Sequence, residues 1–201
     1  MRLLRTPTFW LLAATAVLTI LAPEERRLGS VARLIYLHGA LVWVAFVLLG
    51  LTAVLAMVAL FREGLYGWAR GVFTTTVGVL LVNVVLVPII TKLTWGVAFA
   101  WREPRVILLF FLTAFALGIH LLLDSVDSRI WSTLFLCLPA LAVAAFLTWA
   151  PRMLHPTNPI GTSGSLTIKG FSLAIFLTAL AAALGAAGEL GKGFRVDRAK
   201  D

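Results

Sequence analysis

"LIYLHGALVWVAFVLLGLTAVLAMVALF", residues 34–61, contains no Asp, Glu, Lys or Arg. A helix that crosses the hydrocarbon core of a bilayer needs roughly 20 mainly apolar residues. The quoted stretch is long enough to cross and carries no charge that would have to enter lipid. It therefore predicts a transmembrane helix, with a histidine, His38, and a tryptophan, Trp43, near the point of entry.

The rest of the chain repeats this pattern. Of its 201 residues, 61% are hydrophobic and 13% are charged, and the mean hydropathy is +1.00, which excludes a soluble globular domain. Apolar runs at about 8–21, 34–61, 71–91, 106–123, 130–150 and 168–190 predict an all-α integral membrane protein. We expect one domain over residues 1–201, a bundle of six transmembrane helices. The short first run, which follows two arginines, also fits a cleaved signal peptide.

Six spans place both termini on one side of the membrane, provisionally the cytoplasmic side. The net charge is +8, and nine of the 17 lysines and arginines fall on the side of the termini, including Arg62 and Arg70 between the second and third runs. This near-equal division does not fix the orientation by the positive-inside rule. The outer face nevertheless has the larger net positive charge, because only three of the nine acidic residues fall there, Glu24, Glu25 and Glu103. This suggests an anionic partner on that side. Flanking basic residues are typical of membrane anchoring, so no nucleic-acid partner is expected.

Histidine is the residue that can hold a metal here. Cys137, the single cysteine, lies within an apolar run, so the chain has no disulfide, no cysteine metal site and no covalent heme attachment motif. The chain has three histidines, His38, His120 and His155. Counting helices puts His38, His155 and an outer aromatic loop at 92–105 on the same side. His120 stands four residues before Asp124, close enough on one helix face for a structural pair.

This combination of side chains suits heme. Two neutral imidazoles, His38 and His155, can bind iron from opposite sides of the macrocycle. Aromatic rings in the outer loop can pack on its faces, and basic groups there can pair with its propionates. The loop residues concerned are Trp95, Phe99, Trp101, Arg102 and Arg105. Structural zinc would require four ligands, and no nucleophile and base occur together, so we expect no enzyme.

Simpler interpretations of the same residues remain open. An interfacial histidine can be an anchor, tryptophans form aromatic belts, and arginines extend to the headgroups. A b-type electron-transfer cytochrome would place paired histidines inside the bundle. A cofactor-free small transporter or assembly subunit is the other alternative, although the middle of the spans holds few polar groups beyond Asn83 and His120.

The sequence resembles the heme exporter protein C family, the CcmC-type heme-handling proteins of cytochrome c maturation. The segment "IYLH" at 35–38, followed by Trp43, is similar to the family's first histidine segment. "WGVAFAWREPR" at 95–105 is similar in position and order to its tryptophan-rich WWD loop, and His155 follows the fifth span as the second family histidine does. Phe99 replaces a family tryptophan, and Glu103 matches the family aspartate only if Arg102 is an insertion.

The resemblance covers about residues 8–190 and implies a heme-delivery role. Heme b would be held transiently at the outer face of a bacterial or archaeal cytoplasmic membrane, with both termini cytoplasmic. His38 and His155 would bind the iron, with Trp43 and the outer loop around the porphyrin. A heme chaperone or apocytochrome c would receive it. An ATP-binding cassette transporter complex is an implied partner, because this chain has no nucleotide-binding motif of its own.

Overall fold

The computed structural model of the chain describes residues 6–149 and 160–196, and across those ranges it contains helices and no strand. The α-helices are α1 (Pro7–Leu21), α2 (Val31–Ala59), α3 (Tyr66–Trp95), α4 (Pro104–Leu122), α5 (Arg129–Trp149) and α6 (Leu166–Val196). Two 3₁₀ turns, η2 (Glu63–Leu65) and η3 (Leu123–Ser125), precede α3 and follow α4. Five of the α-helices are long and apolar enough to span a membrane, and α1 is shorter. The protein is an all-α membrane bundle, as the sequence predicts.

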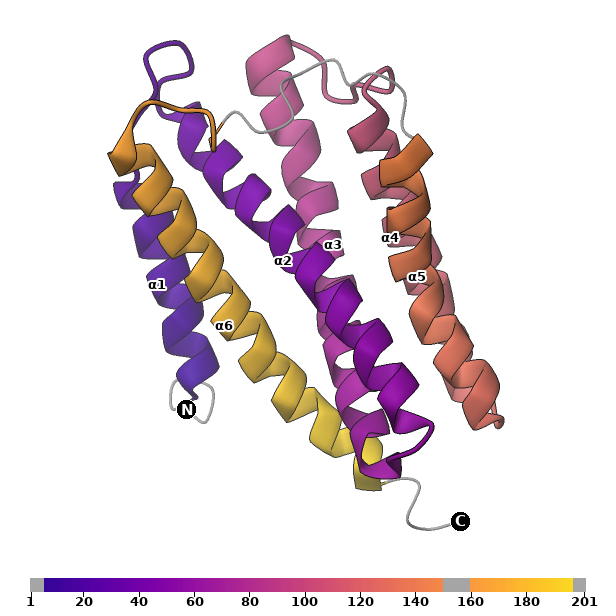
Figure 1. Cartoon of the computed structure of the whole chain (residues 1–201). Helices are drawn as coiled ribbons and strands as arrows, with labels where there is room; N and C mark the ends of the chain where they lie inside the picture. The colour runs from indigo at the N-terminus through magenta and orange to yellow at the C-terminus, as the bar shows by residue number, and fades with distance from the viewer. Residues whose placement is uncertain (1–5, 150–159, 197–201) are drawn as a thin grey trace.

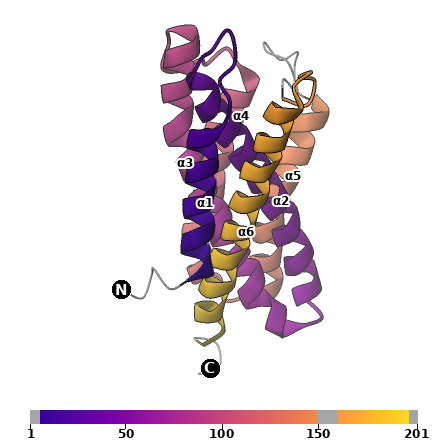
Figure 2. The same ribbon diagram turned by 90° about the vertical axis from the view of Figure 1, so that its left-hand side faces the viewer.

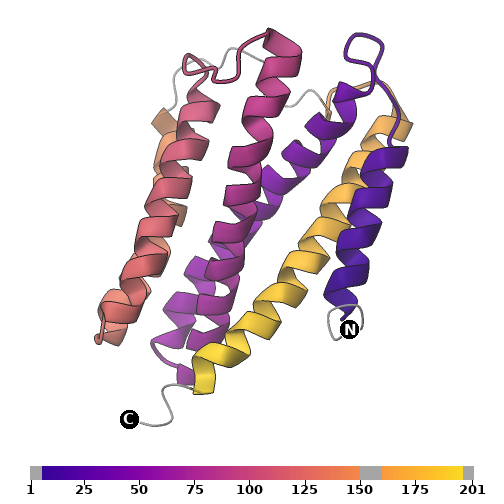
Figure 3. The same ribbon diagram turned by 180° about the vertical axis from the view of Figure 1, so that it is seen from behind.

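The helices run alternately up and down. Figures 1 and 3, taken from opposite sides, show the start of α1 and the end of α6 at the same end of the bundle. We call this the terminal end; η2 and η3 also lie there. The opposite end, here the loop end, carries the α1–α2 connection, the α3–α4 connection, the end of α5 and the start of α6. This is the arrangement expected for six antiparallel spans.

Local residue chemistry sets several helix ends. Thr6 caps α1 by accepting a hydrogen bond from the Phe9 amide at 3.4 Å. α3 ends at Gly96, which adopts φ +76°, a left-handed conformation that glycine enters without steric cost. Helix α3 therefore includes residues 92–95, and the outer loop is shorter than the 92–105 segment expected from hydropathy. The apolar run at 71–91 ends where Lys92 begins the last turn of α3, but the backbone hydrogen bonds of the helix continue through that turn.

Helix α6 packs against α1, α2 and α3, as Figure 2 shows from the α1 and α6 side. Its crossing with α3 depends on glycine. A Cβ atom on Gly71 would lie 2.3 Å from the Ala187 carbonyl oxygen, and one on Gly191 would lie 2.8 Å from the Gly67 carbonyl oxygen. Gly67 and Gly71 stand four residues apart on α3, as Ala187 and Gly191 do on α6. Such pairs of small residues let membrane helices approach closely.

The interior and the surface divide as expected for a bundle in lipid. The largest buried cluster joins α2, α3, α4 and α5 through side chains such as Leu49, Phe73, Leu112 and Leu136. Large apolar side chains also cover the outside, for example Trp10, Val85 and Leu121. An apolar exterior of this extent is compatible with a hydrocarbon surrounding and not with water. The protein is a multi-pass membrane protein.

Candidate functional site

His38 makes a hydrogen bond inside the bundle. Its Nδ1 lies 2.8 Å from Oδ1 of Asn83, which joins α2 to α3. Asn83 is fully buried, and its Nδ2 donates to the Val79 carbonyl oxygen at 3.2 Å. A polar pair of this kind within an apolar bundle is costly unless each group is satisfied. The bond fixes the imidazole relative to both helices.

The depth of His38 differs from the expectation that it marks a helix end. Helix α2 begins at Val31, so His38 lies in its third turn, about 10 Å along the helix from the loop end. The difference arises because Arg33 lies in the first turn of α2, so the apolar run begins at Leu34, three residues after the helix does. Arg33 donates to the Ala22 carbonyl oxygen at 2.9 Å and pairs with Glu24 at 3.4 Å.

The outer loop forms an aromatic cluster. The rings of Phe99 and Trp101 are stacked, with centroids 5.4 Å apart and planes 5° apart. Both rings also meet Phe110 of α4 edge-on, at 5.9 and 5.1 Å respectively. Trp95 closes the last turn of α3, next to this loop, and is about half exposed. Stacked and edge-to-face contacts of this kind hold the two loop rings in a fixed orientation.

Hydrogen bonds from polar residues fix the same loop. The Thr91 hydroxyl donates to the Ala98 carbonyl oxygen at 2.6 Å, which ties the loop back to α3. Glu103 is fully buried and caps α4 by accepting from the Arg105 amide at 3.4 Å. Arg102 is exposed, and Arg105 is partly buried. The loop end thus presents basic and aromatic groups on a fixed backbone.

Trp43 lies apart from His38. Five residues of helix separate them, which places them about 140° apart around the axis of α2. The Trp43 side chain is 62% exposed and makes an edge contact with Phe46. The structure does not bring Trp43 to the face on which His38 meets Asn83.

His155, the second expected ligand, lies outside the described residues. The structure does describe both flanks of its segment: α5 ends and α6 begins at the loop end (Figure 1). Ile160, where the described chain resumes, lies close to α2, and a Cβ atom on Gly39 would be 3.7 Å from its Cδ1 atom. Gly39 follows His38 directly, so the chain resumes beside the expected heme ligand.

The third histidine has a different environment from the expected pair with Asp124. Asp124 instead accepts from Arg70 of α3 at 2.6 Å. The His120 ring lies 6.4 Å from the ring of Phe73, and within the described part of the chain its buried Nδ1 has no hydrogen-bond partner. His120 is near the end of α4, about 24 Å from the loop end.

Sequence reasoning did not identify three polar residues that organise these sites. The sequence presents Asn83 as a polar residue within a span, Glu103 as a loop carboxylate that can match the family aspartate, and Arg70 as a basic residue between spans. All three are buried. The sequence feature that could have identified them is a polar residue in or next to an apolar span. Burying a polar group in a membrane is costly, so such a residue either has a partner or serves a function.

No protein-family model matches the chain, and no curated protein matches it. Fold and composition define its class, a multi-pass α-helical membrane protein with an ordered aromatic and basic loop at one end.

Proposed function

We propose that this protein binds heme at the loop end of the bundle through His38 and His155, and passes it to a heme chaperone or apocytochrome during c-type cytochrome maturation. The supporting observation is the His38–Asn83 hydrogen bond. Histidines that bind metals usually donate their second ring N–H to an acceptor that orients the ring. His38 has such an acceptor, so its donor chemistry fits an axial ligand.

Chain length is compatible with His155 as the opposite ligand. Five residues separate it from Ile160, and an extended chain of five residues spans at most about 18 Å. Because Ile160 lies beside Gly39, the second imidazole is tethered within that reach of the α2 turn that carries His38. The sequence therefore allows both histidines to reach one porphyrin.

The outer loop supplies the remaining contacts in this proposal. The Phe99–Trp101 stack would cover part of a macrocycle edge, and Trp95 borders it. Arg102 and Arg105 would pair with propionates through charge-assisted hydrogen bonds. Trp43 is left out because it occupies another face of α2. The protein would hold and release heme without acting as an enzyme.

Orientation and partners belong to the same proposal. The loop end would face outward from a bacterial or archaeal cytoplasmic membrane, and the termini would be cytoplasmic. An ATP-binding cassette transporter complex would supply the energy for heme transfer, since the chain has no nucleotide-binding motif.

The depth of His38 also bears on the electron-transfer alternative, which requires histidines inside the bundle. That alternative needs a second intramembrane ligand, and His120 is the other intramembrane histidine of the sequence. The two differ by about 14 Å in depth along the bundle. The rings themselves are also far apart, because His38 bonds Asn83 whereas His120 lies beside Phe73, ten residues or about 15 Å earlier on α3. Two metal–nitrogen bonds of about 2 Å each do not bridge rings at those two levels. A heme that uses His38 therefore requires His155 or a ligand from another molecule.

The test is heme content after purification from heme-replete cells. We expect a Soret band in the wild-type protein, a strong loss in His38→Ala and in His155→Ala, and retention in His120→Ala, which controls for removal of a histidine. Formation of c-type cytochrome in cells that depend on this protein should fall with the same two substitutions. A wild-type protein without a Soret band, or a double His38→Ala/His155→Ala variant with unchanged absorbance, would overturn the proposal.

A further inference from the structure

We infer that Asn83 fixes the tautomer of His38, so that Nε2 is the nitrogen that binds iron, and that its neutral amide keeps this ligand a moderate donor that can be exchanged. The tautomer follows from the geometry alone. Its consequence for iron rests on the proposed function. The pair lies between α2 and α3, which run side by side in Figures 1 and 3.

The orientation of the Asn83 amide is determined by its second contact. Nδ2 donates to the Val79 carbonyl oxygen at 3.2 Å, one turn earlier on α3. The flipped amide would place Oδ1 against that carbonyl oxygen, so that two acceptors would face each other. Oδ1 therefore faces His38, and the partner of an amide oxygen must be a donor.

The protonation of the His38 ring follows directly. Since Oδ1 of Asn83 accepts, Nδ1 of His38 carries the proton and donates across 2.8 Å. A neutral imidazole has one N–H, so the lone pair is on Nε2. Asn83 is fully buried, and a buried amide has no water to replace a lost partner. Breaking the His38–Asn83 hydrogen bond would leave a buried polar group unsatisfied, and this cost keeps the bond formed.

The kind of acceptor matters as much as its presence. A carboxylate behind a metal-bound histidine raises the basicity of the ligand and strengthens the bond to the metal. Asn83 offers a neutral oxygen of the same shape, which orients the ring without adding negative charge. A ligand tuned in this way suits a heme that must be released to another protein.

The first experiment needs no heme. In full-length protein that retains only His38, with His120→Gln and His155→Gln, imidazole ¹⁵N chemical shifts report which ring nitrogen is protonated. We expect protonated Nδ1 and unprotonated Nε2, and a mixed pattern after Asn83→Leu. Thr76→Val is the matched control, because Thr76 is equally buried on α3 and, among residues 6–149 and 160–196, its hydroxyl bonds only its own helix, at Val72. It should leave the shifts unchanged. Predominant protonation of Nε2 in the parent protein would overturn the inference.

The second experiment uses the heme-loaded protein. Asn83→Leu should weaken heme binding by about 10- to 100-fold, the usual effect of losing an outer-sphere partner. Asn83→Asp should shift the heme reduction potential in the negative direction and slow heme loss, because a carboxylate makes His38 a stronger donor. Thr76→Val should do neither. The potential of Asn83→Asp is measured at alkaline pH, where the introduced carboxyl is ionised. The iron part of the inference would be overturned if that potential equalled the wild-type potential at the same pH.

The two failures can be distinguished. If heme binds through His38 and yet neither Asn83 variant changes the shifts, affinity or potential, the inference is wrong and the proposed function stands. If no heme binds while the ¹⁵N pattern is as expected, the proposed function is wrong, together with the iron part of the inference, and the tautomer assignment stands.

Discussion

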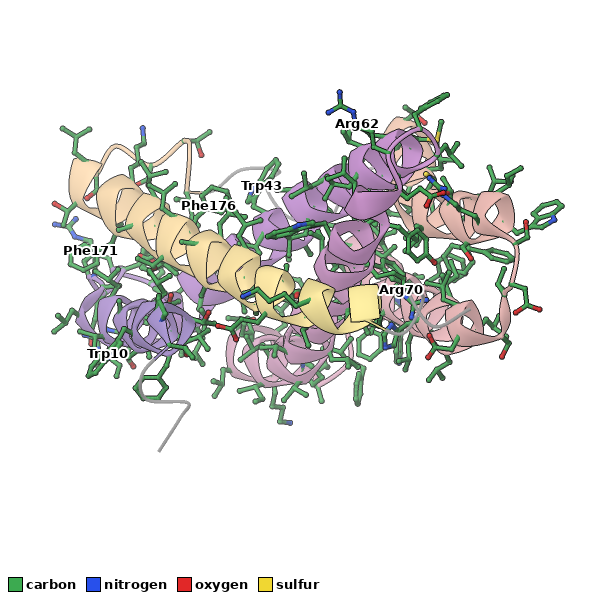
Figure 4. The ribbon with its side chains drawn as sticks, turned by 90° about the horizontal axis from the view of Figure 1, so that it is seen from below. Trp10, Trp43, Arg62, Arg70, Phe171 and Phe176 are labelled. Atoms are coloured by element: carbon green, nitrogen blue, oxygen red, sulfur yellow. The ribbon has the colours of Figure 1, made fainter. Side chains whose placement is uncertain are left out.

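Arg70 of α3 and Asp124 of η3 form an ion pair, with 2.6 Å between Nη2 and Oδ1, in which one partner is buried and the other is exposed. The Arg70 side chain is 4% exposed and the Asp124 side chain 79%. The guanidinium also lies 4.7 Å from the centre of the Phe194 ring of α6. Figure 4 shows Arg70 at the terminal end of the bundle near the end of α6, whereas Arg62 projects away from the helices. Arg70 thus links α3, η3 and α6.

Asp124→Asn should destabilise the bundle, because it removes the charge partner of a buried guanidinium. We expect a loss of about 1.5–3 kcal/mol, the usual range for a hydrogen bond to a charged group. Thermal unfolding in detergent measures it. Arg70→Met added to Asp124→Asn should recover part of the loss, since no buried charge then remains. Asp127→Asn, an exposed change nearby in the sequence, is the control and should unfold like the wild type. Equal unfolding of all four proteins would contradict the prediction.

Gly71→Ala should weaken the contact between α3 and α6. The added methyl group would lie 2.3 Å from the Ala187 carbonyl oxygen and 2.7 Å from the Gly191 nitrogen, so backbone must move. Overpacking of this kind costs about 1–3 kcal/mol. Gly78→Ala makes the same change on the same helix where nothing lies within 4 Å of the new atom, and it should be neutral or slightly stabilising. The measurement is the unfolding temperature of each of the two variants. A Gly71→Ala protein as stable as Gly78→Ala would show that α3 and α6 are not in close contact at this crossing.

Trp101→Leu should weaken heme binding under the proposed function. The substitution removes one ring of the Phe99–Trp101 stack and the edge contact with Phe110. Aromatic pairs are worth about 0.5–1.5 kcal/mol beyond burial, so an affinity loss of roughly 2- to 10-fold is expected in a heme titration. Trp43→Leu is the matched control. Trp43 is exposed to a similar extent as Trp101, but it lies away from the face of α2 that carries His38. A larger loss from Trp43→Leu than from Trp101→Leu would argue against the outer loop as the porphyrin surface.

The sequence predicts the six helices and their alternation because each requires only a long apolar run, which can be recognised without knowing its neighbours. The positions of the helix ends are predicted less accurately. α2 begins before its apolar run, with Arg33 in its first turns, and α3 begins with a segment that contains the buried Arg70. Hydropathy marks where charge begins, whereas a helix ends where its backbone hydrogen bonds end.

The candidate site depends on information that the sequence does not carry locally. His38 and Asn83 meet only because α2 and α3 pack with particular faces together, and this rotation is determined by every buried contact between the two helices. The same applies to Asp124, whose neighbour four residues back, His120, was the expected partner. Arg70, 54 residues away, is nearer in space and carries a permanent charge. Spacing along the chain places His120 and Asp124 near each other, but the packing between helices decides which partner Asp124 takes.

The position of α1 against α6 leads to a final prediction about the first apolar run, which also fits a cleaved signal peptide. In the structure Thr15 of α1 and Thr178 of α6 have hydroxyl oxygens 3.0 Å apart. Each hydroxyl oxygen is one bond from its Cβ atom, so the two Cβ atoms lie within about 6 Å of each other, and a small shift would bring cysteines at these positions to the separation of about 3.5–4.5 Å that a disulfide requires. In a Cys137→Ala background, Thr15→Cys with Thr178→Cys should form a disulfide under mild oxidation.

Proteolysis followed by gel electrophoresis tests whether the disulfide forms. Arg26 and Arg27 are exposed in the α1–α2 turn, so trypsin should cut there and separate α1 from the rest of the chain. With the disulfide formed, the two fragments should stay joined until a reductant is added. Thr15→Cys with Leu177→Cys is the control: Leu177 precedes Thr178, is 52% exposed and lies about 100° around α6, so this pair should not cross-link. A retained helix gives a reducible joined product only for the first pair. Loss of α1 from the mature protein, or equal cross-linking of both pairs, would show that α1 does not hold this place against α6.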